Sequence, residues 1–199
     1  MVEWSIAAFR AARPVRSIVV ACPPGHVHDL GGHDLAVVPG GETRAQSVAN
    51  AMEAVGTELV AIHDAARPLV TPELIEALVA GLAGDPEAAG VIPAAPVTDT
   101  VKQVSKCASG PPQGLDAHFD IETTLDRGRL WAAQTPQVFW TDALRAALAG
   151  DSERVAAATD EAMLVEAAGG RVLIHPASPE NLKVTTPLDL RVAELLLTS

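Results

Sequence analysis

Aromatic residues are scarce in this sequence. None of the 199 residues is a tyrosine, and phenylalanine and tryptophan together make up 3% of the chain. Hydrophobic residues nevertheless account for 48%, so the core must be built from aliphatic side chains. A core of alanine, valine and leucine is more typical of a layered α/β protein than of an all-β protein.

Cysteines and basic residues are also few. Cys22 and Cys107 are far apart, which argues against a disulfide framework or a metal site and favours a reducing cytoplasm. The net charge of −11 disfavours nucleic acid and anionic membranes as partners. No apolar run approaches the length of a membrane span, and the first residues do not resemble a signal peptide. A site for phosphorylated ligands would need basic residues concentrated locally.

Short apolar runs alternate with amphipathic or capped segments. Strands are predicted at 17–21, 35–38, 59–63 and 90–94, and helices at 2–12, 42–55 and 71–82. This alternation predicts a doubly wound, mostly parallel sheet with right-handed crossovers. Because the strands are apolar throughout, helices should cover both faces. The apolar stripe predicted for the first helix contains Trp4, Ala7, Ala8 and Ala11.

The pattern changes after Pro96. Residues 97–105 and 119–125 alternate between apolar and polar, which predicts an antiparallel hairpin inserted in the α/β domain. A two-stranded ribbon is marginally stable alone, so it should pack on something else, such as a second subunit. Further helices are predicted at 141–149, 160–168 and 186–197, and a late strand at 171–175.

Two turns carry the first candidate site residues. Gly40 and Gly41 end a predicted strand directly before a helix, where backbone N–H groups can face an anion or a base. An ordinary turn beside a solvated Arg44 explains the same pattern. Asp64 follows another strand, where open α/β sheets bind ligands, and it could hold Mg²⁺ while Arg67 clamps a phosphate. Alternatively, Asp64 caps the next turn and pairs with Arg67.

Four later segments carry polar residues whose roles remain open. Thr100 and Lys102 should share one face of the hairpin, either as part of a site or as a solvated ribbon. Thr135 lies in a Thr-Pro turn, and Thr159 precedes a capped helix start. Lys183 lies in an apolar run, where it either meets a phosphate or extends to solvent. Together the segments indicate a phosphate-handling α/β domain.

Six ordered segments resemble the 2-C-methyl-D-erythritol 4-phosphate cytidylyltransferase family, and the resemblance extends over about residues 1–198. The segments are PGGETRAQSV, HDAARP, APVTDTVK, DRGRLWAAQTPQVF, TDEAMLVE and NLKVTTPLDL. The resemblance implies a Rossmann-like nucleotidyltransferase domain over 1–199, with a dimerisation arm at about 96–128 and a homodimer. It also implies transfer of a cytidylyl group from CTP to the polyol phosphate in non-mevalonate isoprenoid synthesis, with Mg²⁺ and release of pyrophosphate.

The resemblance also assigns residue roles. The implied nucleotide-binding residues are Gly40, Gly41, Glu42, Ala45, Ser47, Asp64 and Ala65. The implied sugar-phosphate residues are Arg67, Thr100, Arg127, Thr135 and Thr159. The implied catalytic residues are Lys183, Arg127 and Asp64, with Asp64 as the metal ligand. The family often has aspartate where Glu42 stands.

One departure concerns the start of the chain. Members of the family begin with a strand and a glycine-rich loop bearing arginine and lysine, whereas residues 1–5 match the helix after that segment. We interpret the sequence as beginning at an internal methionine or as coming from an incomplete gene. The alternatives are a ribitol-5-phosphate cytidylyltransferase and an inactive dimeric remnant that lacks the triphosphate-binding loop.

Overall fold

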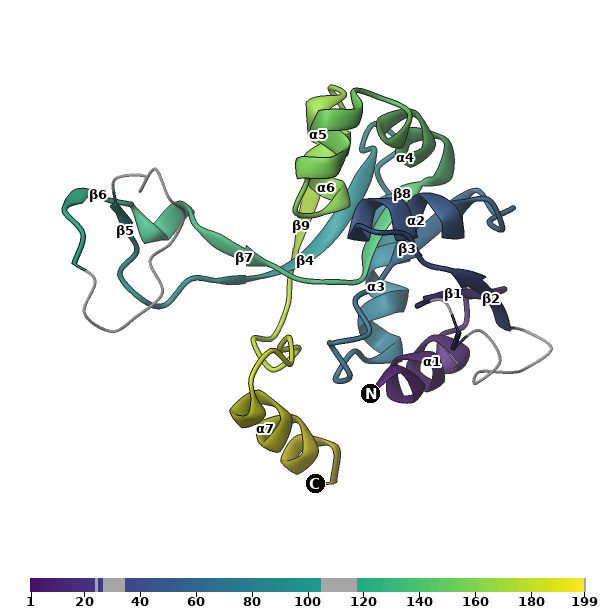
Figure 1. Cartoon of the computed structure of the whole chain (residues 1–199), viewed down its shortest axis with the longest axis horizontal. Helices are drawn as coiled ribbons and strands as arrows, with labels where there is room; N and C mark the ends of the chain where they lie inside the picture. Colours follow the sequence, from purple (N-terminus) through teal and green to yellow (C-terminus); the bar gives the residue numbers. More distant parts are fainter. Residues whose placement is uncertain (24, 27–34, 105–117, 199) are drawn as a thin grey trace.

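A computed structural model describes residues 1–23, 25–26, 35–104 and 118–198 (Figure 1). Its strands are β1 Ile18–Cys22, β2 Leu35–Pro39, β3 Leu59–Ile62, β4 Gly90–Pro96, β5 Lys102–Val104, β6 Ile121–Thr124, β7 Trp131–Ala133, β8 Gln137–Trp140 and β9 Val172–Pro176. Its α-helices are α1 Val2–Ala11, α2 Arg44–Met52, α3 Pro72–Ala83, α4 Thr141–Leu148, α5 Ser152–Ala157, α6 Glu161–Ala167 and α7 Pro187–Thr198, and a 3-10 turn η1 spans Arg127–Arg129.

The central sheet has five strands in the order β3-β8-β4-β7, with β9 also paired to β4. The α/β fold class is confirmed, but the sheet is mixed where a mostly parallel one was expected. The reason is β7 and β8, which both lie antiparallel to β4; β8, which was not predicted, is also antiparallel to β3. The four residues of β8 directly follow a turn, so no period of two is long enough to be visible. The parallel pairing of β4 with β9 extends from Gly90 opposite Val172 to Ala94 opposite Pro176.

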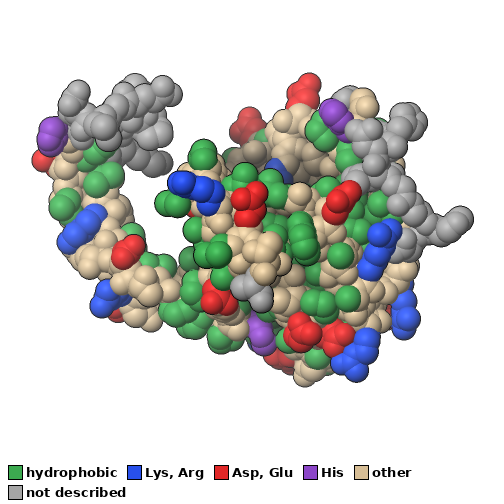
Figure 2. All heavy atoms as spheres, turned by 90° about the horizontal axis from the view of Figure 1, so that it is seen from below, with side chains coloured by type: hydrophobic (Ala, Val, Ile, Leu, Met, Phe, Trp, Pro, Cys, Tyr) green, Lys and Arg blue, Asp and Glu red, His purple; other side chains and the backbone are tan. Residues whose placement is uncertain are grey.

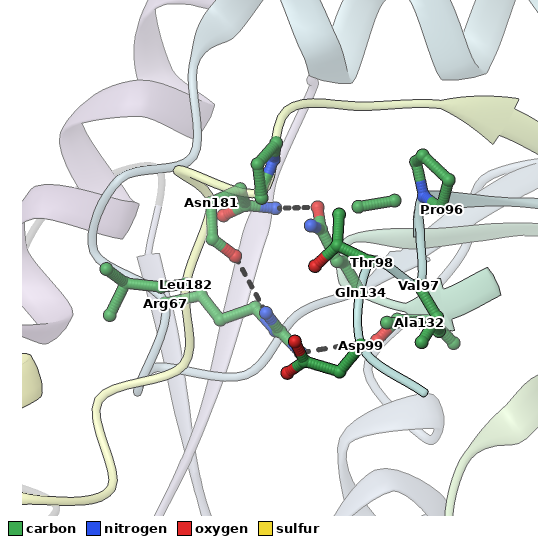
Figure 3. A pocket seen from close by; sticks show the side chains of 12 residues that line it. Arg67, Pro96, Val97, Thr98, Asp99, Ala132, Gln134, Asn181 and Leu182 are labelled. Carbon is green, nitrogen blue, oxygen red and sulfur yellow. Dashed lines mark hydrogen bonds between the residues drawn. The ribbon is translucent and has the colours of Figure 1, made fainter. Parts of the chain in front are cut away.

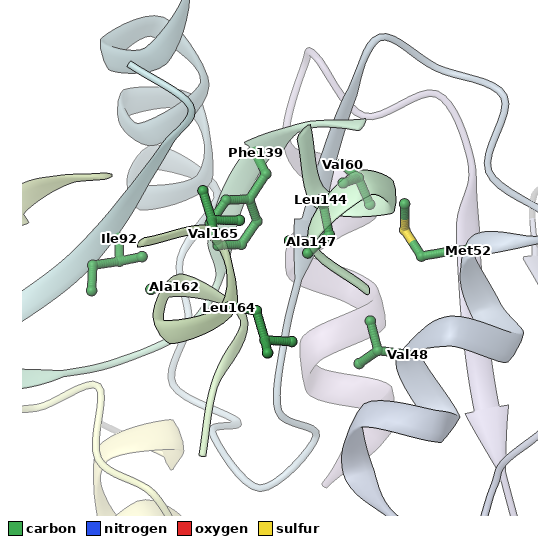
Figure 4. Packing of buried hydrophobic residues seen from close by; sticks show 10 residues of the cluster. All are labelled: Val48, Met52, Val60, Ile92, Phe139, Leu144, Ala147, Ala162, Leu164 and Val165. Atoms are coloured by element: carbon green, nitrogen blue, oxygen red, sulfur yellow. The ribbon is translucent and has the colours of Figure 1, made fainter. Parts of the chain in front are cut away.

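Helices cover both faces of this sheet, as the apolar strands predicted. One face packs on α2, α4 and α6, around the fully buried Phe139 of β8 and the buried Leu144 and Val165 (Figure 4). The other face packs on α3 through Leu78 and Leu82, both completely buried. Thr71 caps α3 by accepting a hydrogen bond from the Leu74 amide, and Pro72 is its first residue, as predicted.

The first two strands form a parallel pair separate from the central sheet. β1 pairs with β2 from Ile18 opposite Leu35 to Cys22 opposite Pro39. It pairs with no other strand in the part of the chain that the structure describes. A cavity of about 730 Å³ separates β1 from β3, with α1, α2 and α3 around it. Its lining includes the apolar side chains of Ile6, Val20 and Ile62. The expected doubly wound sheet is therefore interrupted between β1 and β3.

Residues 96–131 leave the body as an extended arm. Its antiparallel strands β5 and β6 pair Lys102 with Thr124, which confirms the predicted hairpin, while residues 105–117 lie outside the described residues. The arm curves away from the body and leaves an open notch (Figures 1 and 2). Phe119 and Ile121 are 42% and 59% exposed on it.

The last helix, α7, also extends from the body. Among its residues only Ala193 is buried, and Leu188 and Leu195 are 60% and 69% exposed. Among the described residues, no helix combines the length and apolar character needed to span a bilayer.

Candidate active site

Asp64 lies where the sheet presents the carboxyl end of β3. The Asp64 amide donates to the Thr135 hydroxyl at 3.0 Å, and its carbonyl accepts from the Arg67 amide at 2.9 Å. These two bonds fix the turn after β3 against the turn before β8. Asp64 is therefore held at the edge where open α/β sheets bind ligands, as the sequence predicted.

Two cations hold the Asp64 carboxylate. The Lys183 Nζ lies 2.8 Å from Oδ2, and the Arg44 Nε lies 3.1 Å from Oδ1. Burial alone would raise the pKa of Asp64, but the hydrogen bond from Lys183 and the charge of Arg44 outweigh it and hold the pKa below its ordinary value. The alternative in which Asp64 pairs with Arg67 is not what the structure shows. Asp64 and Lys183, two predicted catalytic residues, come together.

The segment that carries Lys183 is irregular and is fixed on both sides. The Val184 amide donates to the Ala66 carbonyl at 2.7 Å. The buried Asn181 donates through Nδ2 to Gln134 Oε1 at 3.0 Å and to the Thr135 carbonyl at 2.9 Å. These hydrogen bonds make the backbone at Lys183 rigid. The Lys183 side chain is 45% exposed, and its ammonium group reaches Asp64 from this fixed backbone.

Arg67 lies in a pocket of about 320 Å³ at the base of the arm (Figure 3). Its Nη1 donates to the Asn181 carbonyl at 2.7 Å, and its buried Nε has no hydrogen-bond partner among the described residues. Burial lowers the pKa of Arg67, which forms no salt bridge within that part of the chain. A half-buried guanidinium without a carboxylate partner attracts an anion. Thr98 and Asp99 complete the polar lining.

The His63 ring connects the turn that carries Arg67 to Thr135. Its Nε2 lies 3.1 Å from the Arg67 carbonyl, which can only accept, so Nε2 carries the proton. Its Nδ1 then accepts from the Thr135 hydroxyl at 3.1 Å. The hydroxyl of Thr135 is therefore already engaged by His63 and by the Asp64 amide, and Thr135 is only 4% exposed. Its predicted contact with the sugar phosphate stays a prediction.

Stability should depend on pH through His63. Burial lowers the pKa of His63 to about 4 from the ordinary 6.5. Between these two values the unfolded chain binds a proton that the folded chain does not. The free energy of unfolding should therefore fall as the pH drops from 6.5 to 4, by about 2–3 kcal/mol from this group. Urea unfolding at pH 7.0, 5.5 and 4.5 measures the change.

His63→Gln is the control for this prediction, because the glutamine amide can still donate to the Arg67 carbonyl without titrating. Acidic groups such as Asp64 contribute to both proteins, so the difference between the two pH curves isolates the imidazole. The difference in free energy of unfolding between the wild-type protein and His63→Gln should become smaller as the pH falls. Parallel curves would show that His63 has an ordinary pKa.

The glycine turn before α2 is stabilised from within. The Gly41 amide donates to Ser47 Oγ at 3.0 Å, and the Glu42 amide donates to Gln46 Oε1 at 3.0 Å. Thr43 caps α2 by accepting from the Gln46 amide, so the helix begins at Arg44, two residues later than predicted. A Cβ on Gly41 would lie 2.3 Å from the Gln46 side chain, so this position requires glycine. Gly40 lies beside Ser47, and Ala45 is buried.

Two predicted substrate residues lie on the arm rather than on the body that carries Asp64, and a third precedes the helix of Glu161. Thr100 and Arg127 are on the arm, where the Arg127 guanidinium donates to the Thr98 carbonyl. Thr159 is exposed just before α6. Ala65 is exposed beside Asp64. Within one chain the structure therefore gathers Asp64, Ala65, Arg67 and Lys183, and leaves the arm residues separate.

Sequence reasoning missed two members of the site. Arg44 was interpreted only as a solvated turn residue, and Glu161 only as an acidic residue in a first helical turn. The structure joins them through a 2.5 Å ion pair between Arg44 Nη1 and Glu161 Oε1. One signal in the sequence could have revealed Glu161. It lies on the same face of α6 as the apolar residues Leu164 and Val165, and a buried carboxylate requires a cation as partner.

A carboxylate at the end of β3, surrounded by a lysine and two arginines, is an arrangement suited to an enzyme that handles phosphate groups. The model of the 2-C-methyl-D-erythritol 4-phosphate cytidylyltransferase family matches residues 1–199. The chain belongs to this family, which confirms the resemblance noted in the sequence.

Individual relatives agree. The chain is 39% identical over 210 residues to the 2-C-methyl-D-erythritol 4-phosphate cytidylyltransferase of Streptomyces avermitilis, covering 99% of this chain and 80% of that protein. It is 42% identical to that of Frankia casuarinae, covering 99% and 70%. The crystal structure of the Thermus thermophilus enzyme superposes with a TM-score of 0.80 at 32% identity, covering 99% and 88%.

Proposed function

We propose that this chain transfers a cytidylyl group from CTP to 2-C-methyl-D-erythritol 4-phosphate and releases pyrophosphate, in non-mevalonate isoprenoid synthesis. The observation that carries the proposal is the placement of Asp64, held by Lys183 and Arg44, next to the Arg67 pocket. Family membership supports the substrate pair, and the relatives named above do not favour the ribitol phosphate alternative.

The polyol phosphate is the anion that we place in the Arg67 pocket. Arg67 offers a cation fixed by Asn181, so it can orient the phosphate without moving. A phosphate oxygen then attacks the α-phosphorus of CTP in line, the new P–O bond forms, and the bond to the bridging oxygen of pyrophosphate breaks. Lys183 lies 2.8 Å from Asp64, where its charge can stabilise the negative charge that develops on the reacting phosphates.

Magnesium is the cofactor that we propose, with Asp64 as its protein ligand. In nucleotide sites Mg²⁺ is held by one or two carboxylates together with substrate phosphates and water, so a single protein carboxylate can be sufficient. When bound, the ion would neutralise phosphate charge. Asp64 suits it because its lowered pKa keeps the carboxylate ionised.

The glycine turn is our candidate for the cytidine. Gly40 and Gly41 carry no side chain and pack closely against Ser47 and Gln46 of α2, so a ligand can approach the backbone at this turn. Ser47 and Thr43 hold this backbone rigid. A rigid backbone edge can read the hydrogen-bonding groups of a base. Glu42 and Ala45 lie at the same turn and belong to the proposed contact.

We further propose a homodimer formed through the arm at about 96–128, with 1–199 as one nucleotidyltransferase domain. Exposed Phe119 and Ile121 give the arm an apolar surface that a second copy could cover. Thr100 and Arg127, which lie on the arm, would then complete the site of the second copy, and the exposed Thr159 would contribute to the sugar-phosphate site beside Glu161. The buried free thiol of Cys22 suits the reducing cytoplasm, where we place the reaction.

A pyrophosphate-release assay tests the function. Purified chain is incubated with CTP, Mg²⁺ and either 2-C-methyl-D-erythritol 4-phosphate or ribitol 5-phosphate. We expect release only with the first. Release only with ribitol phosphate would overturn the substrate, and no release with either would favour the inactive remnant.

A further inference from the structure

Glu161 is a buried carboxylate that is paired with Arg44. It begins α6, its side chain is 1% exposed, and Oε1 accepts from Arg44 Nη1 at 2.5 Å. Its other oxygen, Oε2, is buried and has no hydrogen-bond partner among the described residues. A half-satisfied buried carboxylate is costly to the fold. Stability alone therefore does not account for it.

Arg44 connects this carboxylate to the active site. The same guanidinium that binds Glu161 through Nη1 binds Asp64 Oδ1 through Nε, at 3.1 Å. Because the guanidinium is planar and rigid, fixing one side of it fixes the other. Glu161 thus determines where Arg44 lies, and Arg44 determines the orientation of the Asp64 carboxylate. The connection joins the start of α6, the start of α2 and the end of β3.

The charges in this cluster balance in pairs. Glu161 compensates Arg44, and Lys183 lies on the other oxygen of Asp64. Without Glu161, Arg44 would carry an uncompensated positive charge directly beside Asp64. That charge would repel a divalent cation approaching Asp64 and would also loosen the guanidinium from its position.

We propose that Glu161 is a positioning residue for divalent-cation binding: through Arg44 it orients the Asp64 carboxylate and preserves the negative charge of that carboxylate for the ion. This rests on the proposed function only in taking Asp64 as the ligand of a cation bound with CTP. Because its side chain is 1% exposed, Glu161 acts through Arg44.

The test measures cation binding directly. Mn²⁺ is titrated into the chain with CTP and, in parallel, into CTP alone, because the triphosphate itself binds the ion. Free Mn²⁺ is followed by electron paramagnetic resonance, the difference between the two titrations gives binding to the protein complex, and the Mg²⁺ dependence of pyrophosphate release is measured alongside. Glu161→Gln keeps the shape of the side chain and removes its charge. We expect its Mn²⁺ dissociation constant to rise about tenfold. Glu166→Gln, an exposed substitution on the same helix, should leave it unchanged.

A double substitution separates positioning from a merely structural role. In an Arg44→Met background, Glu161→Gln should change Mn²⁺ binding less than about twofold, because the connection is already broken. Arg44→Lys, which keeps the charge but loses the fork, should also weaken binding and provides the test if Glu161→Gln does not fold.

Unchanged Mn²⁺ binding in Glu161→Gln, or an equal effect with Arg44→Met present, would overturn the inference. Failure of the wild-type chain to bind Mn²⁺ with CTP would overturn it too. Mn²⁺ binding without any pyrophosphate release would instead count against the proposed function and leave the inference standing on its binding data.

Discussion

Asp64→Asn should reduce pyrophosphate release by about 100- to 1,000-fold, the usual effect of removing one electrostatic group from a transition state. The amide has the shape of the carboxylate but not its charge, so it can neither bind a cation strongly nor hold Lys183 at Oδ2. Lys183→Ala should cause a loss of similar size, because it removes the cation beside the reacting phosphates. Both are measured as kcat and KM with CTP and 2-C-methyl-D-erythritol 4-phosphate.

Asp142→Asn is the matched control, because the Asp142 carboxylate is fully exposed and makes only a 3.8 Å surface pair with Arg145. It should keep wild-type activity. Circular dichroism should show that all three variants remain folded, since Asp64 and Lys183 lie at the surface end of β3 rather than in the core. Near-normal turnover in Asp64→Asn or Lys183→Ala would remove that residue from the mechanism.

The second large effect concerns the contact between Gly90 and Phe139. These residues face each other across β4 and β8, and a Cβ added to Gly90 would lie 2.3 Å from the Phe139 ring. Phe139→Ala should lower the free energy of unfolding by about 3–5 kcal/mol through cavity formation. Gly90→Ala should lower it by about 1–3 kcal/mol through overpacking. Urea denaturation gives both values.

The double variant shows whether the two effects share one cause. Once the ring is gone, a methyl group on residue 90 meets empty space, so Gly90→Ala should cost little in the Phe139→Ala background. Gly81→Ala, at an exposed helical glycine with nothing within 4 Å of the added methyl, should stabilise by up to about 1 kcal/mol. If the losses in the free energy of unfolding are additive in the double variant, the Phe139 ring is not the reason why residue 90 must be glycine.

Local patterns predicted much of this fold. The helix over 71–82 carries its own start signals in Thr71 and Pro72, and the strand at 59–63 is bounded by turn residues. The face of α1 was predicted wrongly for Trp4, Ala7 and Ala11, which are exposed, although Ala8 is buried as expected; the other buried apolar side chains are Ile6 and Phe9. An alanine-rich helix has no strong apolar stripe of its own, so its partner α3 decides which face is buried.

The site was predictable where a residue follows a strand and not where it depends on a distant contact. Asp64 was visible because its place at the end of β3 is a local property. The roles of Arg44 and Glu161 depend on a contact between residues 117 positions apart in the chain. No periodicity encodes such a contact, and the acid in the first turn of α6 has an adequate local explanation.

The separation of β1 and β2 from the central sheet has a consequence for cooperativity. No backbone hydrogen bonds between described strands cross the cavity between β1 and β3, so the two sheets are coupled only through the helices that flank it. We therefore expect the β1–β2 pair to open more readily than the central sheet. Amide protons of β1 should exchange with solvent well before those of β4, and thermal unfolding should be broader than a single two-state transition.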